Sequence, residues 1–410
     1  MARKMRDSGV EWIGEVPEGW GITRLRFIAD ITTGNKDTQD ANPDGAYPFY
    51  VRSPIVERST DYTFDGLGIM MAGDGAGAGR VFHLATGKYA VHQRVYRISD
   101  FKDIDARFLW RYLMITFPFV MDKGSAQSTV PSVRLPMLQN HSIVSPPRPE
   151  QQRIADYLDG KCAAIDMAVD ELKRGIEDCK AWKKAIIEET VFSGLRHKEF
   201  VETGDDWLTS IPSSWGFEQI RYLFALRDER NDKPLSEVNL ISLYTDQGVV
   251  QHCDLEKTTG NKASTADGYK IVKENDIVVN IILCWMGAIG RSAYNGVTSP
   301  AYDVYRPVDE SRVLSRYYHY LFRTSRFNGK CYQEGRGIMM MRWRTYSSEF
   351  RAIKVPVPPI EEQQAIANYL DEKCAAIDAL VAEKEKLITD LEAYKKSLIF
   401  ELVTGKREVA

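Results

Sequence analysis

A long internal repeat constrains the fold of this chain more than any other feature of its sequence. Residues 150–166 read EQQRIADYLDGKCAAID and residues 362–378 read EQQAIANYLDEKCAAID, so 14 of the 17 positions are identical at an offset of 212 residues. A second match, at an offset of 195 residues, pairs Trp20-Gly21 with Trp215-Gly216. A match of this length does not arise by chance. The chain is therefore a duplication in which each half has a variable body and a nearly fixed tail.

The two tails are predicted to be long helices. Each follows a proline-rich segment and carries glutamate in its first turn, which are signals for the start of a helix. Apolar residues then recur at alternating intervals of four and three, the spacing of a coiled-coil seam. In the first tail these residues are Leu158, Cys162, Ile165, Val169, Leu172, Ile176 and Cys179.

Pairing of the two tails with each other is the economical arrangement, because the chain has only two such helices. The pair would be antiparallel, with one body at each end and a pseudo-twofold axis between them. A helix over residues 150–191 would span ~60 Å at 1.5 Å per residue. The alternative is that each apolar stripe packs on its own body.

The bodies are predicted to be mixed domains of short strands and a few helices. Runs such as Gly68–Ala72 and Val91–Ile98 have strand character, and no regular alternation of strand and helix follows, which argues against a doubly wound sheet. We therefore expect an α+β protein with a first body (1–148), a first helix (149–198), a second body (199–356) and a second helix (357–410). Four tryptophans near the body starts are predicted to be buried and to anchor body to helix: Trp12, Trp20, Trp207 and Trp215.

Charge and composition exclude several classes of protein. The 410 residues include 54 Lys and Arg against 57 Asp and Glu, so the net charge of -3 excludes a uniformly basic nucleic-acid coat protein. The longest apolar run is well short of the ~20 residues that cross a bilayer, and no secretory signal is visible, so we expect no membrane association. The six cysteines are scattered without metal-ligand spacing, which favours a reducing cytoplasm and predicts no metal site.

No motif predicts catalysis or cofactor binding. Residues 73–79 contain a GxGxxA pattern, but a strand-like run follows instead of the helix that a dinucleotide site requires. The segment Ser145-Pro146-Pro147-Arg148 lacks the aromatic residue of the methyltransferase motif that it otherwise matches. The sequence has no P-loop and no nucleophile signature. We therefore expect that the chain itself is not an enzyme.

Two local stretches concentrate positive charge. Residues 312–354 hold ten basic residues and two acidic ones, and residues 80–97 hold four basic residues and no acidic one. The basic residues are interleaved with aromatic and hydroxyl side chains, as contacts to phosphates and base edges require. A solvated charged surface is the alternative interpretation of either stretch.

The whole chain resembles the specificity (S) subunit of type I restriction-modification systems. The resemblance rests on the two Pro-Pro…Glu-Gln-Gln…Tyr-Leu-Asp…Lys-Cys…Ile-Asp helices and on the Trp/Pro segments that start the two bodies. It implies that each body is a target recognition domain for one half of a bipartite sequence in double-stranded DNA. It also implies that the paired helices dock two methyltransferase subunits. S-adenosylmethionine would then be held by those partners, and ATP by the separate restriction subunits of the full complex.

Candidate DNA-binding residues follow from aligning the two bodies. Val95-Tyr96-Arg97 matches Val304-Tyr305-Arg306, and Gly79-Arg80 matches Gly290-Arg291. Two alternatives to a DNA-recognition subunit remain: a DNA methyltransferase or nuclease that acts alone, and a coiled-coil scaffold that does not touch DNA. The candidates are Arg80, Lys88, His92, Gln93 and Arg94 in the first body, and Arg291, Ser299, Tyr302, Arg336 and Arg342 in the second.

Overall fold

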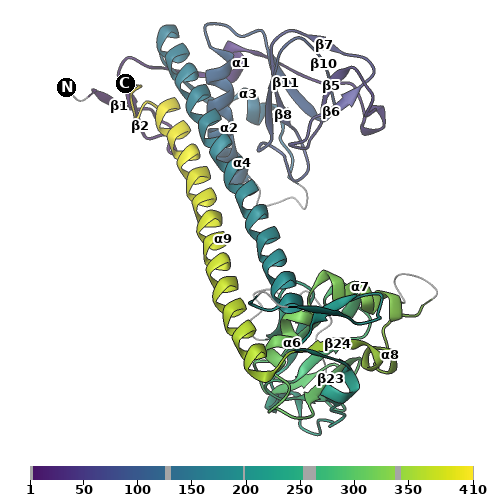
Figure 1. Cartoon of the computed structure of the whole chain (residues 1–410). Helices are drawn as coiled ribbons and strands as arrows, with labels where there is room; N and C mark the ends of the chain where they lie inside the picture. Colours follow the sequence, from purple (N-terminus) through teal and green to yellow (C-terminus); the bar gives the residue numbers. More distant parts are fainter. Residues whose placement is uncertain (1–2, 125–130, 197–198, 253–264, 338–342, 410) are drawn as a thin grey trace. The chain divides into compact units, whose positions relative to one another are not determined.

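The structure is a computed structural model, and it describes residues 3–124, 131–196, 199–252, 265–337 and 343–409. The chain divides into two compact units. The first unit comprises Met1–Lys173 together with Glu385–Ala410, and the second unit comprises Arg174–Lys384. Two long helices, α4 (Arg148–Ser193) and α9 (Ile360–Val403), each contribute one part to each unit (Figure 1).

The first unit is built on a four-stranded antiparallel sheet in the order β4-β11-β8-β9. A second sheet, in the order β6-β5-β10-β7, includes the parallel pair β5 and β10. The strands of the two sheets are β4 (Asp30–Thr33), β5 (Tyr47–Tyr50), β6 (Glu57–Ser59), β7 (Phe64–Asp65), β8 (Gly68–Ala72), β9 (Phe82–Ala85), β10 (Lys88–Val91) and β11 (Val95–Ser99). The other elements of this body are β1 (Met5–Asp7), β2 (Glu15–Pro17), β3 (Gly21–Arg24), α1 (Leu25–Ile28), η1 (Thr38–Asp40), α2 (Ala106–Gly124), α3 (Leu135–Gln139) and β12 (Ser142–Ser145).

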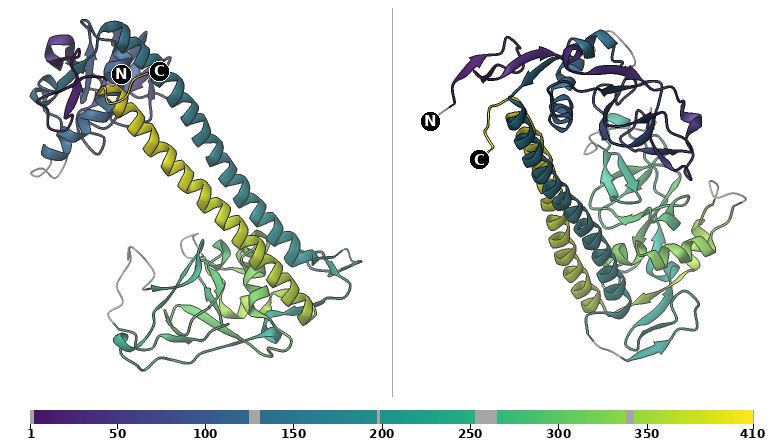
Figure 2. Two further views of the ribbon diagram at one scale, coloured as in Figure 1. Left: turned by 90° about the vertical axis from the view of Figure 1, so that its left-hand side faces the viewer. Right: turned by 90° about the horizontal axis from the view of Figure 1, so that it is seen from above.

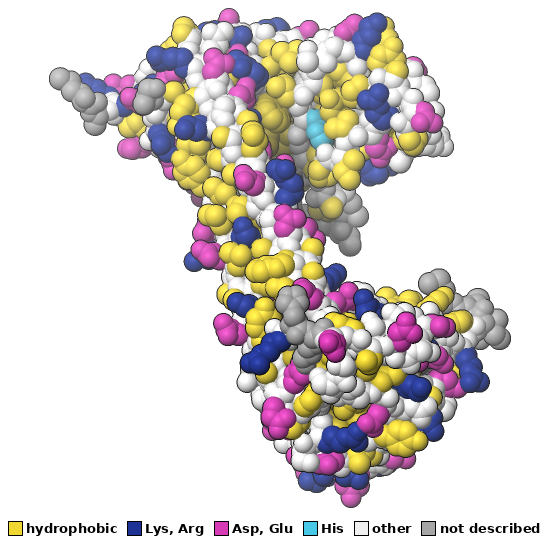
Figure 3. Space-filling model, in the orientation of Figure 1, with side chains coloured by type: hydrophobic (Ala, Val, Ile, Leu, Met, Phe, Trp, Pro, Cys, Tyr) yellow, Lys and Arg dark blue, Asp and Glu magenta, His cyan; other side chains and the backbone are white. Residues whose placement is uncertain are grey.

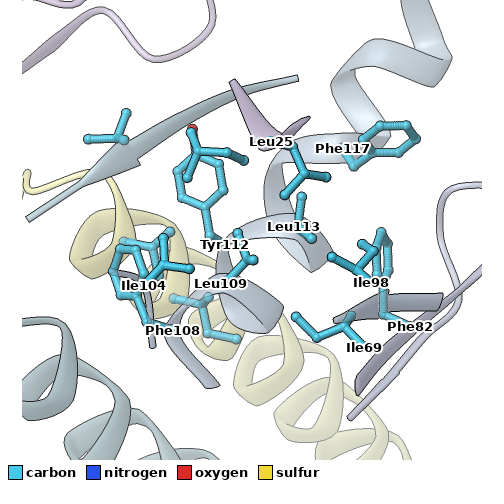
Figure 4. Close-up of a cluster of buried hydrophobic side chains, with 14 of the residues drawn as sticks. Leu25, Ile69, Phe82, Ile98, Ile104, Phe108, Leu109, Tyr112, Leu113 and Phe117 are labelled. Atoms are coloured by element: carbon cyan, nitrogen blue, oxygen red, sulfur yellow. The ribbon is translucent and has the colours of Figure 1, made fainter. Parts of the chain in front are cut away.

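The core of the first unit lies between helix α2 and the β4-β11-β8-β9 sheet. Ile69 and Ile98 from the sheet meet Leu113 and Phe117 from α2, and all four side chains are fully buried (Figure 4). The same core extends to Leu158 of α4, so burial of apolar surface joins body and helix.

The second unit has a sheet of the same design, in the order β16-β23-β20-β21, again antiparallel throughout. Its strands are β13 (Phe200–Glu202), β14 (Ser210–Pro212), β15 (Gly216–Gln219), β16 (Phe224–Leu226), β17 (Ile241–Tyr244), β18 (Gly248–Gln251), β19 (Lys270–Val272), β20 (Ile277–Asn280), β21 (Ile289–Arg291), β22 (Gly296–Thr298), β23 (Tyr302–Pro307) and β24 (Lys354–Val357). Its helices are α5 (Ile220–Leu223), η3 (Leu235–Glu237), η5 (Cys284–Met286), α6 (Ser315–Phe322), α7 (Ser325–Glu334) and α8 (Ser347–Ala352).

The register of the two sheets corrects the predicted alignment of the bodies. Ile98 pairs with Ile69 on one side and Ile31 on the other, just as Tyr305 pairs with Ile277 and Leu226. The equivalent residues are therefore 207 apart, whereas the Val-Tyr-Arg match placed them 209 apart. A slip of two residues keeps every side chain on the same face of a strand, so the apolar pattern could not detect the error.

The predicted strand Val91–Ile98 is also wrong as a single element. Strand β10 ends at Val91 and β11 begins at Val95, because the two strands belong to different sheets. A tight turn joins them, in which the carbonyl oxygen of His92 accepts a hydrogen bond from the N–H of Val95 at 2.9 Å.

The predicted antiparallel pairing of the long helices is confirmed within each unit. In the first unit, Leu158 and Cys162 near the start of α4 pack with Leu398 and Leu402 near the end of α9 (Figure 2). In the second unit, the end of α4 and the start of α9 share one apolar cluster, which contains Val191, Phe192, Ile366 and Leu370. As predicted, each helix ends at a glycine with positive φ: α4 ends just before Gly194 (φ 76°), and α9 ends two residues before Gly405 (φ 75°).

Candidate nucleic-acid interface

The same tryptophan–glutamate hydrogen bond joins each body to its long helix. The indole N–H of Trp20 donates to Glu150 in the first turn of α4 at 3.1 Å, and that of Trp215 donates to Glu362 in the first turn of α9 at 2.9 Å. Trp20, Trp207 and Trp215 are buried as predicted. Trp12 is half-buried and stacks on a histidine ring of the core.

A buried glutamine forms a second joint in each unit. The Oε1 atom of Gln151 accepts from the backbone N–H of Asp105 at 2.6 Å, and its amide donates to the carbonyl of Pro146 at 2.8 Å. Gln363 makes the corresponding bonds to Leu314 and Pro358, at 2.9 and 2.8 Å. These bonds fix the segment that leads into α2 or α6, so both bodies are mounted on their helices in the same way.

Equivalent turns carry candidate residues at the same edge of the two sheets. Residues His92 to Val95 form the turn before β11, and residues Ser299 to Tyr302 form the turn before β23. In each turn the first side chain accepts from the backbone N–H two residues later: His92 Nδ1 from Arg94 at 3.0 Å, and Ser299 Oγ from Ala301 at 3.3 Å. Thus Ala301 occupies the place of Arg94, whereas the predicted alignment set Ala301 opposite His92.

In the first unit, Arg94 and Arg52 share the carboxylate of Asp74. Arg94 Nη1 lies 2.6 Å from one oxygen and Arg52 Nη1 lies 2.9 Å from the other. Partial burial acts to raise the pKa of Asp74, but the hydrogen bonds from the two arginines outweigh it and hold that pKa below its ordinary value. Asp74 is therefore charged at neutral pH and orients both guanidinium groups.

Next to this group, His92 and Gln93 both face the loop that contains Asp37. The amide of Gln93 donates to Asp37 at 2.9 Å, and its side chain is exposed. His92 is only 2% exposed, and burial lowers its pKa, so the neutral ring supports the turn. The predicted contact of His92 with a base stays a prediction, and in this structure the ring is buried. Its role in this structure is to hold Gln93 and Arg94 in place.

Lys88 and Arg80 lie apart from the turn. Lys88 begins β10, at the opposite end of that strand, and its ammonium lies 4.6 Å from the ring centre of Tyr62. Arg80 precedes β9 and forms an ion pair with Asp122 of α2 in which both side chains are largely exposed. Both lysine and arginine remain accessible to a ligand.

The predicted equivalence of Arg80 and Arg291 is wrong. Arg291 lies in β21 opposite Ile277, and the residue of the first unit with that register is Leu84, opposite Ile69. The Gly-Arg pairs coincide in sequence only, because a glycine-rich turn precedes β9 whereas the short helix η5 precedes β21. The Arg291 side chain donates to Asn275 at 2.8 Å.

Of the remaining candidates of the second unit, Tyr302 lies beside the end of β20 and Arg336 follows α7. Tyr302 begins β23 opposite Asn280 and is half-buried; burial, with a smaller effect from Tyr244, raises its pKa, so the hydroxyl stays protonated. Arg336 is 73% exposed on its side chain and pairs with Glu349. The last candidate, Arg342, lies outside the described residues.

Four of the ten basic residues in the stretch 312–354 form ion pairs within the part of the chain that the structure describes. Much of its charge is paired with acidic residues, several of them distant in sequence: Arg312 with Glu218, Arg316 with Asp371, Lys330 with Glu334, and Arg336 with Glu349. On the face drawn in Figure 3, Lys and Arg side chains alternate with Asp and Glu. Counting charges within the stretch missed Glu218 and Asp371, because tertiary structure brings them to it from other parts of the sequence.

Two arginines that hold the loops at the sheet edges in place were not predicted from the sequence. Arg52 follows strand β5 without any motif around it. Arg323, just after α6, donates to the carbonyl oxygens of Gly287 and Ile289 at 3.2 and 2.9 Å, and thereby ties the loop before β21 to the helix. A pattern search finds neither residue, because their partners are brought together only by the fold.

Two further observations bound the chemistry of the described part of the chain. Within residues that the structure describes, no group of three or more His, Cys, Asp or Glu side chains is placed to hold a metal ion. Among the same residues, no helix combines the length and the apolar character needed to cross a membrane.

Comparison with known proteins decides the family. The profile of the type I restriction modification DNA specificity domain matches residues 17–172 and again residues 214–389, one copy for each half of the repeat. The chain belongs to this family. Members of the type I specificity family that it resembles include the EcoDI specificity subunit of Escherichia coli, which is 22% identical, with 96% of this chain and 90% of the relative covered. The MjaVIII specificity subunit of Methanocaldococcus jannaschii is 23% identical, with 96% and 94% covered.

Solved structures of the type I specificity family share the fold. A chain from work on complex assembly and conformational transition of the type I restriction-modification system superposes with a TM-score of 0.69 at 14% identity, covering 96% of this chain and 99% of that one. The HsdS subunit of Thermoanaerobacter tengcongensis gives a TM-score of 0.53 at 14% identity, with 96% and 98% covered. The predicted resemblance and the predicted α+β fold with two long helices are confirmed.

Proposed function

We propose that this chain is the non-catalytic, sequence-specific DNA-binding subunit of a type I restriction-modification complex. Each unit reads one half of a bipartite target in double-stranded DNA. The paired helices α4 and α9 dock two methyltransferase subunits, and restriction subunits join in the full complex. S-adenosylmethionine and ATP are held by those partners, and the complex acts on DNA in the cytoplasm.

The observation that carries this proposal is the contrast between the repeated and the divergent parts of the two units. The strand order of the four-stranded antiparallel sheet, the Trp–Glu joints and the Gln joints recur, whereas the turns at the sheet edge differ, with His92-Gln93-Arg94 in one and Ser299-Pro300-Ala301 in the other. Two identical partners need two identical docking surfaces. An asymmetric DNA target needs two different reading surfaces.

A methyl-transfer assay separates this proposal from the enzyme alternative. The purified chain is mixed with S-adenosylmethionine and DNA, first alone and then with its methyltransferase partners. We expect methylation in the second mixture only. Methylation by the chain alone would favour a methyltransferase that acts by itself. If the complete mixture shows no duplex affinity, the coiled-coil scaffold is the better description.

Exchange of the bodies tests the two-reader arrangement. Methylation mapping in a host with the full system first gives the target. A chain with the bodies transposed between the two helices should then methylate a target with its half-sites transposed. Replacement of Arg94 or Tyr302 should relax one half-site only, and equal loss of specificity at both half-sites would contradict the arrangement.

A further inference from the structure

The first unit holds an arginine pair whose geometry goes beyond general DNA contact. Arg52 and Arg94 donate to the two different oxygens of Asp74, at 2.9 and 2.6 Å. The three residues come from three segments: the stretch after β5, the loop between β8 and β9, and the turn before β11. The Asp74 side chain is 18% exposed, whereas those of Arg52 and Arg94 are 41% and 63% exposed.

Glycines press the Asp74 loop against both arginine-bearing segments. A Cβ atom on Gly73 would lie 2.8 Å from the carbonyl oxygen of Arg94, and one on Gly77 would lie 2.6 Å from that of Arg52. Both distances are too short for any other residue, so the loop is fixed on each side. Gly75 between them has φ of +76° and also lacks a side chain. The backbone N–H of Gly75 also donates to the carbonyl of Pro131 at 3.0 Å, and the carbonyl of Gly73 accepts from the N–H of Val133 at 2.7 Å, so the loop that carries Asp74 is held from a third side as well.

Each guanidinium keeps most of its donors. An arginine has five N–H groups in a rigid fork, and Asp74 takes one from each residue. Within the described part of the chain, no other side-chain hydrogen bond of Arg52 or Arg94 is formed. The two guanidinium groups and the one carboxylate together carry a net charge of +1.

We propose that Arg94, positioned by Asp74, reads a guanine in the half-site bound by the first unit, by donating to its O6 and N7 atoms in the major groove. The proposal rests on the proposed function. Arginine donating with two N–H groups to guanine is the commonest specific side-chain contact to a base. A phosphate contact needs only positive charge, and a neighbouring carboxylate weakens it. A directional contact gains from that carboxylate, because the plane of the fork is held before binding.

The proposed arginine–guanine contact is available to the first unit only. The residue equivalent to Arg94 is Ala301, and the loop that follows β20 in the second unit begins Ile281-Ile282 where the first unit has Gly73-Asp74. The second unit must therefore read its half-site by other contacts, and the equivalent position offers no guanidinium.

The test uses the complex of the chain with its methyltransferase partners and its mapped target. Each guanine of both half-sites is replaced in turn by 7-deazaguanine, which lacks the N7 acceptor, and the dissociation constant is measured. We expect one guanine, in one half-site, at which this replacement weakens binding by the wild-type complex about 10-fold or more. Arg94→Met, which removes both the N–H donors and the charge, should weaken binding to the unmodified target by at least a similar factor and should abolish the effect of that single replacement. Other 7-deaza replacements should affect the variant and the wild type equally.

Asp74→Asn tests the positioning role, because it should change general affinity and base discrimination in opposite directions. Loss of the negative charge frees both arginines, so affinity for unrelated duplexes should rise while discrimination at the guanine falls. Damage to the fold lowers both quantities and would contradict a positioning role. Arg52→Met is the matched control for a second arginine on the same carboxylate, and thermal unfolding of each variant confirms that it is folded.

Two other outcomes overturn the proposal. If Arg94→Met weakens binding to all duplexes uniformly and reduces its salt dependence by about one phosphate contact, Arg94 binds the backbone. If no guanine couples to Arg94, or the half-sites contain none, the base assignment is wrong. Failure of the proposed function looks different, because the wild-type complex would then bind its target no better than unrelated DNA.

Discussion

The ammonium of Lys183 lies 2.6 Å from the carboxylate of Asp378 in the second unit. In the first unit Lys395 makes the same contact with Asp166, also at 2.6 Å. Adding the repeat offset of 212 to Asp166 and Lys183 gives Asp378 and Lys395, so each ion pair is the image of the other. The duplicated helices thus repeat in one unit the antiparallel contact that they make in the other.

A charge exchange tests this helix contact. Lys395→Glu places two carboxylates together, and we expect the free energy of unfolding to fall by about 1 kcal/mol, since these groups are partly exposed. The double variant Lys395→Glu with Asp166→Lys should recover most of that loss in a chemical denaturation cycle. Lys396→Glu, at the exposed neighbouring position, is the control. No recovery in the double variant would show that the pair contributes nothing.

The buried glutamine of each joint should contribute far more to the free energy of unfolding than the ion pairs do. Gln151→Leu leaves the N–H of Asp105 and the carbonyl of Pro146 without their partner inside the protein, and we expect a loss of about 2–4 kcal/mol in the free energy of unfolding. Gln152→Leu changes an exposed neighbour of the same type and should be nearly neutral. A similar stability of the two variants would mean that water replaces the lost bonds.

The first unit should lose stability in mild acid through His141. Burial lowers the pKa of His141 to about 3, against ~6.5 in an unfolded chain. Below pH 6.5 the unfolded state binds a proton that the folded state does not, so this residue's contribution to stability declines as the pH falls toward 3. We expect its share to be about 2 kcal/mol between pH 7 and pH 5. Chemical denaturation at pH 7 and pH 5 should show a smaller change in the free energy of unfolding for His141→Gln than for the wild type.

Arg323 should position the reading surface of the second unit. It is mostly buried and donates to carbonyl oxygens of two loops, which include Gly287 and Asp246. Arg323→Met removes these bonds, so we expect discrimination at the second half-site to fall about 10-fold while the first half-site is read normally. The discrimination at each half-site is measured by methylation of targets in which only that half-site is altered. Equal loss at the two half-sites would indicate a general defect instead.

Much of the architecture could be predicted because the duplication is visible as a repeat in the sequence. The seam from Leu158 to Cys179 and the glycine stops at Gly194 and Gly405 depend on local periodicity and backbone freedom, which a sequence displays directly. The tryptophan anchors followed from the spacing of the body starts. Register was missed, because Val95-Tyr96-Arg97 and Val304-Tyr305-Arg306 are identical in letters and only hydrogen bonding shows that they are shifted by two.

The candidate site shows where sequence reasoning ends. Arg94 and Gln93 remain candidates predicted from a basic stretch without acidic residues, whereas His92 is buried. No pattern in the sequence points to Arg52, which the fold places beside Asp74. By itself, the sequence determined two variable bodies on two repeated helices, since repeats and periodicity are properties of neighbours along the chain. Only the tertiary structure decided which charges are paired and which arginine is aimed outward, because those partners lie tens of residues apart and meet only when the sheets and loops assemble.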